Sequence, residues 1–344
     1  MQTKLTQTGK LLDPQGKLTQ VGWSLQPILD CNLEYARFYD IRIFQRFRIK
    51  RWDYYAIFTP HLFFSATIAD LGYAGNIFVY ILDYARNELH EEGLVIPFSR
   101  GIQLPRNSDQ GASFFQDKRA RLHFEVLPAG RHIQVSWPAF HGGRGISADI
   151  LLHQAADHES MSIVIPIMQR RFYYNRKINC LPAEGSLRNG DQHESLSPES
   201  CLGSLDWGRG VWEYKSFWNW ASASGFLPDG QTIGLNLGCG FGDLTAATEN
   251  CLVLNGKVHK LAQVNFTYLS PDFMRPWRIT DSERRLDLEF VPFKERLAQT
   301  NLGIINSEVH QMFGRYSGMV STDDGSKIEI NNLIGFAEEH QARW

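Results

Sequence analysis

Alternation of apolar and polar residues with a period of two is the feature that most constrains this sequence. In the segment 121–126, Leu122, Phe124 and Val126 alternate with charged or polar residues. Successive side chains of a strand point to opposite faces, so this pattern predicts a half-buried antiparallel strand. The same alternation occurs over 132–137, 285–290 and 327–330, and further strands are expected over 63–68, 76–84, 161–168, 231–237 and 263–268.

Turn residues separate these segments at short intervals. Asn255-Gly256, between two short apolar runs, is the strongest signal and predicts a two-residue hairpin. Amphipathic spacing over ten or more residues is hard to find. Many short strands with regular turns predict an all-β protein, either a sandwich or barrels, with few helices. The 344 residues have room for two barrels.

The polar stretch 184–204 is the best candidate for a boundary between two units. The predicted organisation is an N-terminal extension with the first strands over 1–50, a first barrel over 51–190 and a second barrel over 191–344. The same stretch also fits a long hairpin loop, and the sequence leaves that alternative open.

Charge and composition exclude several classes of function. The net charge of -2 gives no global electrostatic reason to bind nucleic acid or an acidic membrane surface. The polar N-terminus has no signal-peptide pattern, and no apolar run is long enough for a membrane helix. The five cysteines are odd in number, widely spaced and without a CxxC pair. We therefore expect a cytoplasmic protein without disulfides, metal or cofactor.

One basic segment is an exception to this neutral balance. Over 37–51, five arginine and lysine residues from Arg42 to Arg51 are interleaved with apolar ones. This pattern favours a strand with a solvated basic face over a surface for phosphates or lipid headgroups. Peripheral contact with a membrane stays open, and the oligomeric state is not predicted.

A glycine-rich segment, Leu235 to Asp243, looks like the first motif of methyltransferases that use S-adenosylmethionine. The residues that follow lead into a hairpin rather than a long helix, and no acidic residue ends a second strand at the expected distance. The context therefore favours a glycine-rich strand end, where missing side chains permit close packing.

Aromatic residues are concentrated between Trp207 and Trp220. Interpreted as one strand, this segment places Trp212, Tyr214, Trp218 and Trp220 on the same face. Such a face is either core or the wall of a cavity for a hydrophobic molecule. Polar residues that could orient a ligand in such a cavity are Asp206, Arg209, Asn236, Asp243, Glu249 and His310.

Ten short motifs, in a preserved order from Leu12 to Trp344, resemble the family catalogued as domain of unknown function 2804. They begin at Arg51, Ala69, Asn179, Asp206, Trp218, Gly234, Thr248, Asp272, Ser307 and Gly335, and include Arg51-Trp-Asp-Tyr-Tyr55, Asp206-Trp-Gly-Arg-Gly-Val-Trp212 and Gly335-Phe-Ala-Glu-Glu-His340. The turn at Gly238–Asp243 departs from the family pattern, in which a lysine or glycine followed by tryptophan is expected.

The resemblance implies a fold of two tandem lipocalin-like barrels. Distant relatives of the family include carotenoid hydratases, tocopherol cyclases and fungal pericyclases, which act on hydrophobic substrates in barrel cavities. The His-x-Trp and Tyr-x-Asp signatures associated with the hydratases are absent, so no catalytic residue is carried over. A shared fold does not transfer a reaction.

Three functions remain. The first is an enzyme that modifies an isoprenoid or lipid, as a hydratase or cyclase, with a buried carboxylic acid, Asp206 or Glu249, as proton donor. Its ligand-binding residues would be Arg209, Trp212, Tyr214, Trp218, Trp220, Asn236 and His310. The second is a carrier of a hydrophobic molecule, which needs the aromatic wall but no catalytic acid. The third is a carbohydrate-active enzyme with paired carboxylates.

Overall fold

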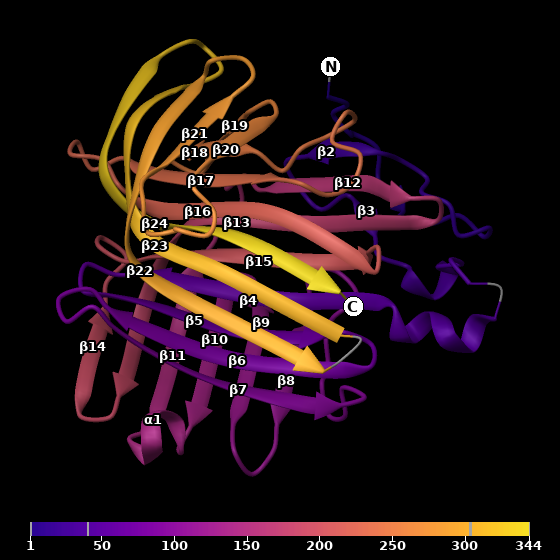
Figure 1. The fold of residues 1–344 in the computed structure, drawn as a ribbon, viewed down its shortest axis with the longest axis horizontal. Coiled ribbons are helices and arrows are strands. Elements are labelled where there is room, and N and C mark those ends of the chain that lie inside the picture. Colours follow the sequence, from indigo (N-terminus) through magenta and orange to yellow (C-terminus); the bar gives the residue numbers. More distant parts are fainter. Residues whose placement is uncertain (1, 40, 303–304, 344) are drawn as a thin grey trace.

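The computed structural model describes residues 2–39, 41–302 and 305–343, and strands dominate it. Two large antiparallel sheets curl into half-barrels that pack against each other (Figure 1). The all-β prediction is therefore confirmed. Outside the sheets lie a short parallel pair, β1 (Gly9–Lys10) and β3 (Leu29–Asp30), and three short helical segments, η1 (Leu33–Tyr35), η2 (Arg42–Phe47) and α1 (Phe140–Gly143).

The first sheet has 13 strands. In order of pairing its main path is β7 (Glu88–Pro97), β6 (Ala74–Asp83), β5 (Leu62–Asp70), β4 (Ile49–Phe58), β15 (Leu202–Val211), β13 (Arg171–Asn189), β11 (Ile146–His153), β10 (Gly130–Trp137), β9 (Arg121–Leu127) and β8 (Ala112–Gln116). Off this path, β12 (Met161–Met168) and β14 (Gln192–Leu196) pair with β13, and β2 (Gly22–Ser24) pairs with β12.

The second sheet has nine strands. They are β19 (Lys257–Lys260), β18 (Cys251–Leu254), β17 (Thr232–Cys239), β16 (Lys215–Phe226), β24 (Lys327–Arg343), β23 (Ile305–Ser321), β22 (Leu286–Leu302), β21 (Trp277–Asp281) and β20 (Val264–Thr267), in order of pairing. Asn255 and Gly256 form the turn between β18 and β19, with φ of 49° and 73°, as the hairpin prediction requires.

A bulge in β13 lets one strand serve two parts of the first sheet. The register with β15 shifts between Ile178 and Leu181, and Cys180 has φ of 61°. Before the bulge β13 pairs with β12 and β15; after it the strand pairs with β15 for two more residues and then with β11 and β14. Because a bulge bends a strand and increases its twist, it contributes to the curl of this sheet.

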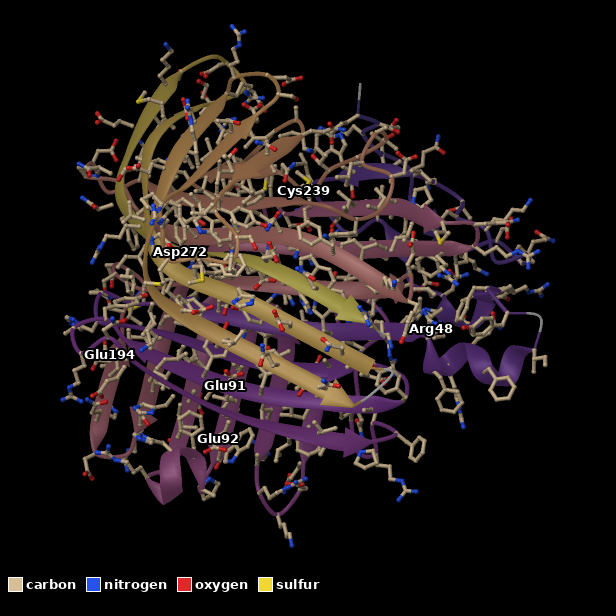
Figure 2. All side chains as sticks on the ribbon, viewed as in Figure 1. Arg48, Glu91, Glu92, Glu194, Cys239 and Asp272 are labelled. Atoms are coloured by element: carbon tan, nitrogen blue, oxygen red, sulfur yellow. The ribbon has the colours of Figure 1, made fainter. Side chains whose placement is uncertain are left out.

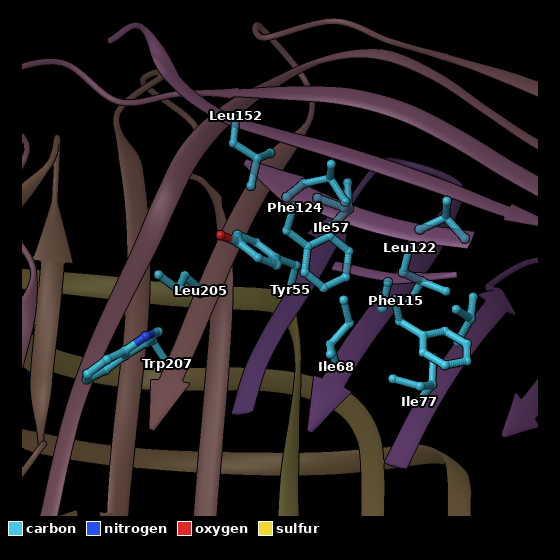
Figure 3. Packing of buried hydrophobic residues seen from close by; sticks show 14 of the residues in the cluster. Tyr55, Ile57, Ile68, Ile77, Phe115, Leu122, Phe124, Leu152, Leu205 and Trp207 are labelled. Atoms are coloured by element: carbon cyan, nitrogen blue, oxygen red, sulfur yellow. The ribbon is translucent and has the colours of Figure 1, made fainter. Parts of the chain in front are cut away.

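Central strands of the first sheet are buried on both faces. On β4, Tyr55 and Ile57 belong to the core inside the first half-barrel, whereas Tyr54 and Phe58 pack against the second sheet. Figure 3 shows the inner side, where the Tyr55 and Phe124 rings meet at 5.1 Å between centroids. The outer side of β4 therefore lies in a layer between the two sheets.

Two sequence interpretations are corrected by the strand assignments. The segment 206–220 is not one strand, because β15 ends at Val211 and β16 begins at Lys215 in the other sheet. The four aromatic residues of the predicted stripe consequently do not share one strand face. Residues 42–47 form η2 rather than a basic strand.

The polar stretch 184–204 contains the end of β13, its hairpin with β14 and the start of β15. Pairing passes from the first sheet to the second between Val211 and Lys215. The division into folding units at residues 50, 190 and 344 remains a prediction. Among the described residues, no helix is long and apolar enough to cross a membrane.

Candidate site between the two sheets

Lys177 is the centre of a buried polar cluster between the sheets. Its ammonium lies 2.8 Å from Asp206 and 3.5 Å from Glu249. The three side chains are buried, and Lys177 and Asp206 occupy directly opposite positions on β13 and β15. Burial lowers the pKa of Lys177, but the two neighbouring carboxylates outweigh it and raise this pKa above its usual value. Lys177 therefore stays charged and neutralises part of the cluster.

Glu249 reaches this cluster from the segment before β18. Asn175 on β13 donates a hydrogen bond to its carboxylate at 2.6 Å, and Asn236 on β17 donates to its backbone carbonyl at 2.8 Å. A Cβ at Gly238 would lie 2.2 Å from the Glu249 carboxylate. Gly238 belongs to the segment that looks like a methyltransferase motif, and its missing side chain leaves room for Glu249. Burial raises the pKa of Glu249, opposed by Lys177.

Glu338, on β24, is a third buried carboxyl group in the same layer. It lies opposite Trp220 of β16 and opposite Gln311 of β23. The Trp218 indole N–H and the Gln311 amide donate to its two oxygens at 3.3 and 3.1 Å. Burial raises the pKa of Glu338 to about 7, although Arg296 acts in the opposite direction. At neutral pH a large fraction of this group therefore carries a proton.

A chain of hydrogen bonds continues from Glu338 to the first sheet. Gln311 accepts from the Tyr80 hydroxyl at 3.0 Å, and the Tyr80 and Tyr54 hydroxyls lie 2.8 Å apart. Arg296 forms a two-pronged ion pair with Glu91 of β7, which is labelled in Figure 2. Side chains of both sheets thus form one hydrogen-bonded network across the layer.

Trp220 lies between Lys177, with its two carboxylate partners, and Glu338. The Lys177 ammonium lies 4.2 Å from the centroid of its ring, and its indole N–H donates to Asn236 at 2.9 Å. Tyr54 and Phe336 meet the ring edge to face, at 5.7 and 4.9 Å. We call Lys177, Asp206, Trp220, Glu249 and Glu338 the inter-sheet cluster.

A band of five aromatic residues covers one end of the inter-sheet cluster. Trp212 packs on Trp52 and on Tyr173, each at 5.1 Å between centroids, and Phe241 packs on Tyr173 at 5.2 Å and on Trp218 at 6.1 Å. Trp52, Trp218 and Phe241 are half-buried, whereas Tyr173 and Trp212 are buried. We call these five residues the aromatic band. Its rings contact one another, and only those of Trp52, Trp218 and Phe241 are partly exposed to solvent.

Six of the nine residues predicted from sequence lie in or beside this layer. Asp206, Glu249, Trp220 and Asn236 belong to the polar contacts above, and Trp212 and Trp218 belong to the aromatic band. Tyr214 lies in the connection between β15 and β16, and its side chain is 41% exposed.

Arg209 and His310 point away from the inter-sheet cluster. Arg209 binds Asp53 at 2.8 Å and the carbonyl of Trp52 at 2.7 Å, on the face of the first sheet opposite to Asp206. His310 contacts Glu295, Glu308 and the Phe273 ring, on the face of β23 opposite to Gln311. Arg209 and Asp206 lie on opposite faces because residues 206 and 209 differ by an odd number of positions along one strand.

Lys177, Asn175, Gln311 and Glu338 were not among the predicted residues. A signal existed for Glu338, which lies in the Gly335-Phe-Ala-Glu-Glu-His340 motif of the resemblance. Lys177 follows Asn175 and Arg176 in a run of polar residues, and such a run is typical of a solvated surface. A sequence pattern does not show that this surface is covered by another sheet.

Known structures share this arrangement of two curled sheets. CghA crystallised with Sch210972 has a TM-score of 0.55 and 10% identity, with 86% of this chain and 88% of that chain covered. Another CghA structure has the same TM-score and identity, with 98% and 97% covered. Kievitone hydratase from Nectria haematococca has a TM-score of 0.48 and 12% identity, with 86% and 88% covered.

The likeness to CghA concerns the fold alone, which is that of two curled antiparallel sheets in a tandem lipocalin-like arrangement. The family model described as Domain of unknown function (DUF2804) matches residues 2–344. The chain therefore belongs to that family, as its motifs indicate. A search of the curated proteins gives no match.

Proposed function

We propose that this protein binds a hydrophobic small molecule between its two sheets and transfers a proton to it. The observation that carries this proposal is Glu338, a buried carboxyl group whose pKa is raised to about 7 beside Trp218 and Trp220. A general acid works best when its pKa lies near the operating pH. Strongly perturbed carboxyl groups in a shielded layer are typical of functional sites.

Charge in the layer favours a substrate that becomes cationic. The carboxyl groups of Asp206, Glu249, Glu338 and Glu91 accompany two cations, Lys177 and Arg296. An anionic ligand would bring further negative charge into a layer that already has more carboxyl groups than cations. A neutral alkene that receives a proton becomes a carbocation, which the remaining carboxylates and the aromatic rings stabilise.

The proposed step moves one proton. Glu338 gives its proton to one carbon of a double bond, which leaves a carboxylate on Glu338 and a positive charge on the neighbouring carbon. In a hydratase, water then binds that carbon and returns a proton to Glu338. In a cyclase, a second double bond of the substrate attacks the cation, and loss of a proton to Glu338 completes the turnover.

Asp206 and Glu249 keep their proposed place as acids, but the contacts favour an electrostatic role for them. Both lie beside the Lys177 ammonium, which opposes the rise that burial causes in the pKa of Glu249. The ligand is proposed to contact Trp212, Trp218, Trp220 and Asn236. Its contacts with the first two would replace contacts between rings of the aromatic band. A structure of the same fold, CghA, holds the small molecule Sch210972, which supports a ligand of this class.

The alternative functions predict different outcomes. A carrier needs the aromatic band but no proton on Glu338. A sugar-cleaving enzyme needs two carboxyl groups across an open cleft, and the exposed fractions of Glu338 and Asp206 are 7% and 8%. The five free cysteines suit a reducing compartment, and we propose the cytoplasm.

The test begins with native mass spectrometry of gently purified protein, which identifies a bound apolar molecule. That molecule and its unsaturated precursors are then incubated with the full chain and with Glu338→Gln. We expect turnover to fall by about 100-fold or more when the general acid is removed. Asp206→Asn and Glu249→Gln test the two acids proposed from sequence.

Glu339→Gln is the matched control, because Glu339 follows Glu338 on β24 but faces the opposite side, where it accepts a hydrogen bond from Tyr268. Its turnover should stay within a few-fold of the parent chain. Unchanged turnover in Glu338→Gln would assign the proton transfer to another group. A bound molecule that returns unchanged from the parent chain would favour a carrier.

A further inference from the structure

Large apolar side chains are exposed at the end of the layer that the aromatic band covers. Ile41 and Phe44, in and beside η2, are 62% and 53% exposed. Tyr214 and Phe217, at the β15–β16 connection, are 41% and 39% exposed, and Met168, at the end of β12, is 51% exposed. Figure 1 shows the coil before β4, the end of β12 and the end of β24 on the same side of the molecule, at the right.

Contacts join these segments into one surface. Arg48, labelled in Figure 2, follows η2 and donates to the Trp212 carbonyl at 3.1 Å. A Cβ at Gly240 would lie 2.9 Å from the Phe217 ring, so this loop lies against β16. The same loop donates from the Asp243 backbone to the carbonyl of Pro166 on β12 at 2.8 Å. The exposed apolar residues therefore surround the aromatic band from several sides.

Positive charge is concentrated in the same segments. Residues 36–48, 166–171, 212–217 and 240–245 contain seven arginines and lysines and three acidic residues, a net charge of +4, whereas the whole chain carries -2. In addition, Lys215 lies directly opposite Arg343 on β24. Like charges in opposite positions of a sheet are unfavourable unless an anion faces them.

We propose that this end of the molecule docks on an anionic lipid bilayer. We call Ile41, Phe44, Met168, Tyr214 and Phe217, with the cations beside them, the docking surface. Exposed aromatic and aliphatic side chains insert at the boundary between headgroups and acyl chains, and lysine and arginine contact anionic headgroups. An anionic bilayer offers an apolar phase and anionic headgroups together, and so matches both properties of this surface.

Docking in this orientation places the aromatic band at the lipid surface. A hydrophobic molecule would then pass between bilayer and protein without crossing water. The proposal about docking does not depend on the function of Glu338, because vesicle binding is measured without any ligand of the inter-sheet cluster.

Vesicle co-sedimentation of the full chain tests the docking surface. We use vesicles of phosphatidylcholine alone and of equal parts phosphatidylcholine and phosphatidylglycerol. The parent chain should bind the anionic vesicles, and added salt should weaken the binding. Arg46→Glu with Lys215→Glu should reduce the partition coefficient by about tenfold or more. Phe44→Ser with Phe217→Ser should reduce it by a similar factor.

Controls of matched chemistry lie elsewhere on the surface. Val291→Ser with Met319→Ser removes apolar side chains that are 45% and 41% exposed, and Lys118→Glu with Lys327→Glu makes the same change of charge at exposed positions. Both control pairs should bind vesicles like the parent chain. Circular dichroism confirms that each variant is folded.

Three results would overturn the proposal. One is equal binding of the parent chain to both kinds of vesicle, or binding to neither. Another is an equal loss in the control pairs and in the docking-surface variants. The third is a dimer in sedimentation analysis that Phe44→Ser with Phe217→Ser converts to monomer, because the surface would then bind a second copy of the chain.

Discussion

The Lys177 ammonium lies 4.2 Å from the centroid of the Trp220 ring, and this contact joins the two sheets. Lys177 belongs to β13 of the first sheet, and Trp220 belongs to β16 of the second. Cation–π contacts in desolvated positions contribute about 2 kcal/mol. The same lysine binds Asp206 and Glu249, so one side chain couples the packing of the sheets to the charge of the candidate site.

Glu338 should make stability depend on pH. Burial raises its pKa from 4.5 to about 7 in the folded chain, so the folded state binds more protons than the unfolded state between these values. The stabilisation is fully present below pH 4.5 and is lost as the pH rises through about 7. Over this interval the contribution of Glu338 to the free energy of unfolding changes by roughly 3 kcal/mol.

Glu338→Gln removes this titration and keeps the shape of the side chain. The difference in the free energy of unfolding, variant minus parent chain, should therefore increase by roughly 3 kcal/mol from pH 4.5 to pH 8. Urea unfolding at a series of pH values measures the difference. A difference that does not change with pH would contradict a raised pKa.

Lys177→Met should destabilise the chain by about 3–5 kcal/mol at pH 8, because two buried carboxylates lose their common cation. The loss should be smaller at pH 5, because burial raises the pKa of Glu249 and its protonation removes part of the unpaired charge. Urea unfolding midpoints at both pH values give the comparison. In the control Lys257→Met, an exposed pair with Asp157 is lost, and the midpoint should change little. Equal effects of the two substitutions would argue against a buried cluster.

Gly208→Ala should disturb the aromatic band. An added Cβ would lie 2.2 Å from the Trp52 indole, which packs over this glycine. We expect a loss of about 1–3 kcal/mol in the free energy of unfolding and a shift in tryptophan fluorescence. Gly93→Ala is the control, because its added Cβ meets ordinary contacts at 3.8 Å. The prediction fails if the two variants have the same stability and emission.

Arg209→Lys separates stability from ligand binding. Arg209 is buried on the other face of the first sheet, where it binds Asp53 and the carbonyls of Trp52, Gly208 and Pro105. A lysine cannot reproduce these contacts, so stability should fall while the Kd for the neutral lipophilic dye Nile red stays within about twofold. Trp220→Leu, in the proposed site, should raise that Kd by about tenfold. An equal increase of the Kd in both variants would indicate that Arg209 belongs to the ligand site.

Much of the strand content could be predicted from local patterns. The prediction over 161–168 matches β12, and the Asn255-Gly256 turn joins β18 to β19. These elements depend on alternation and turn chemistry within a few residues, which a single sequence displays. The break between β15 and β16 could not be predicted in this way, because the two strands belong to different sheets while the alternation continues through the connection.

By itself the sequence determined the fold class, the aromatic concentration near Trp220 and the presence of Asp206 and Glu249. Tertiary structure decided which of these residues meet. Lys177, Asp206 and Glu249 are far apart in the chain, and strand register together with the packing of one sheet on the other brings them together. A polar residue on an alternating strand is solvated or buried according to what covers its face, and only the packing of the second sheet makes Glu338 a buried acid.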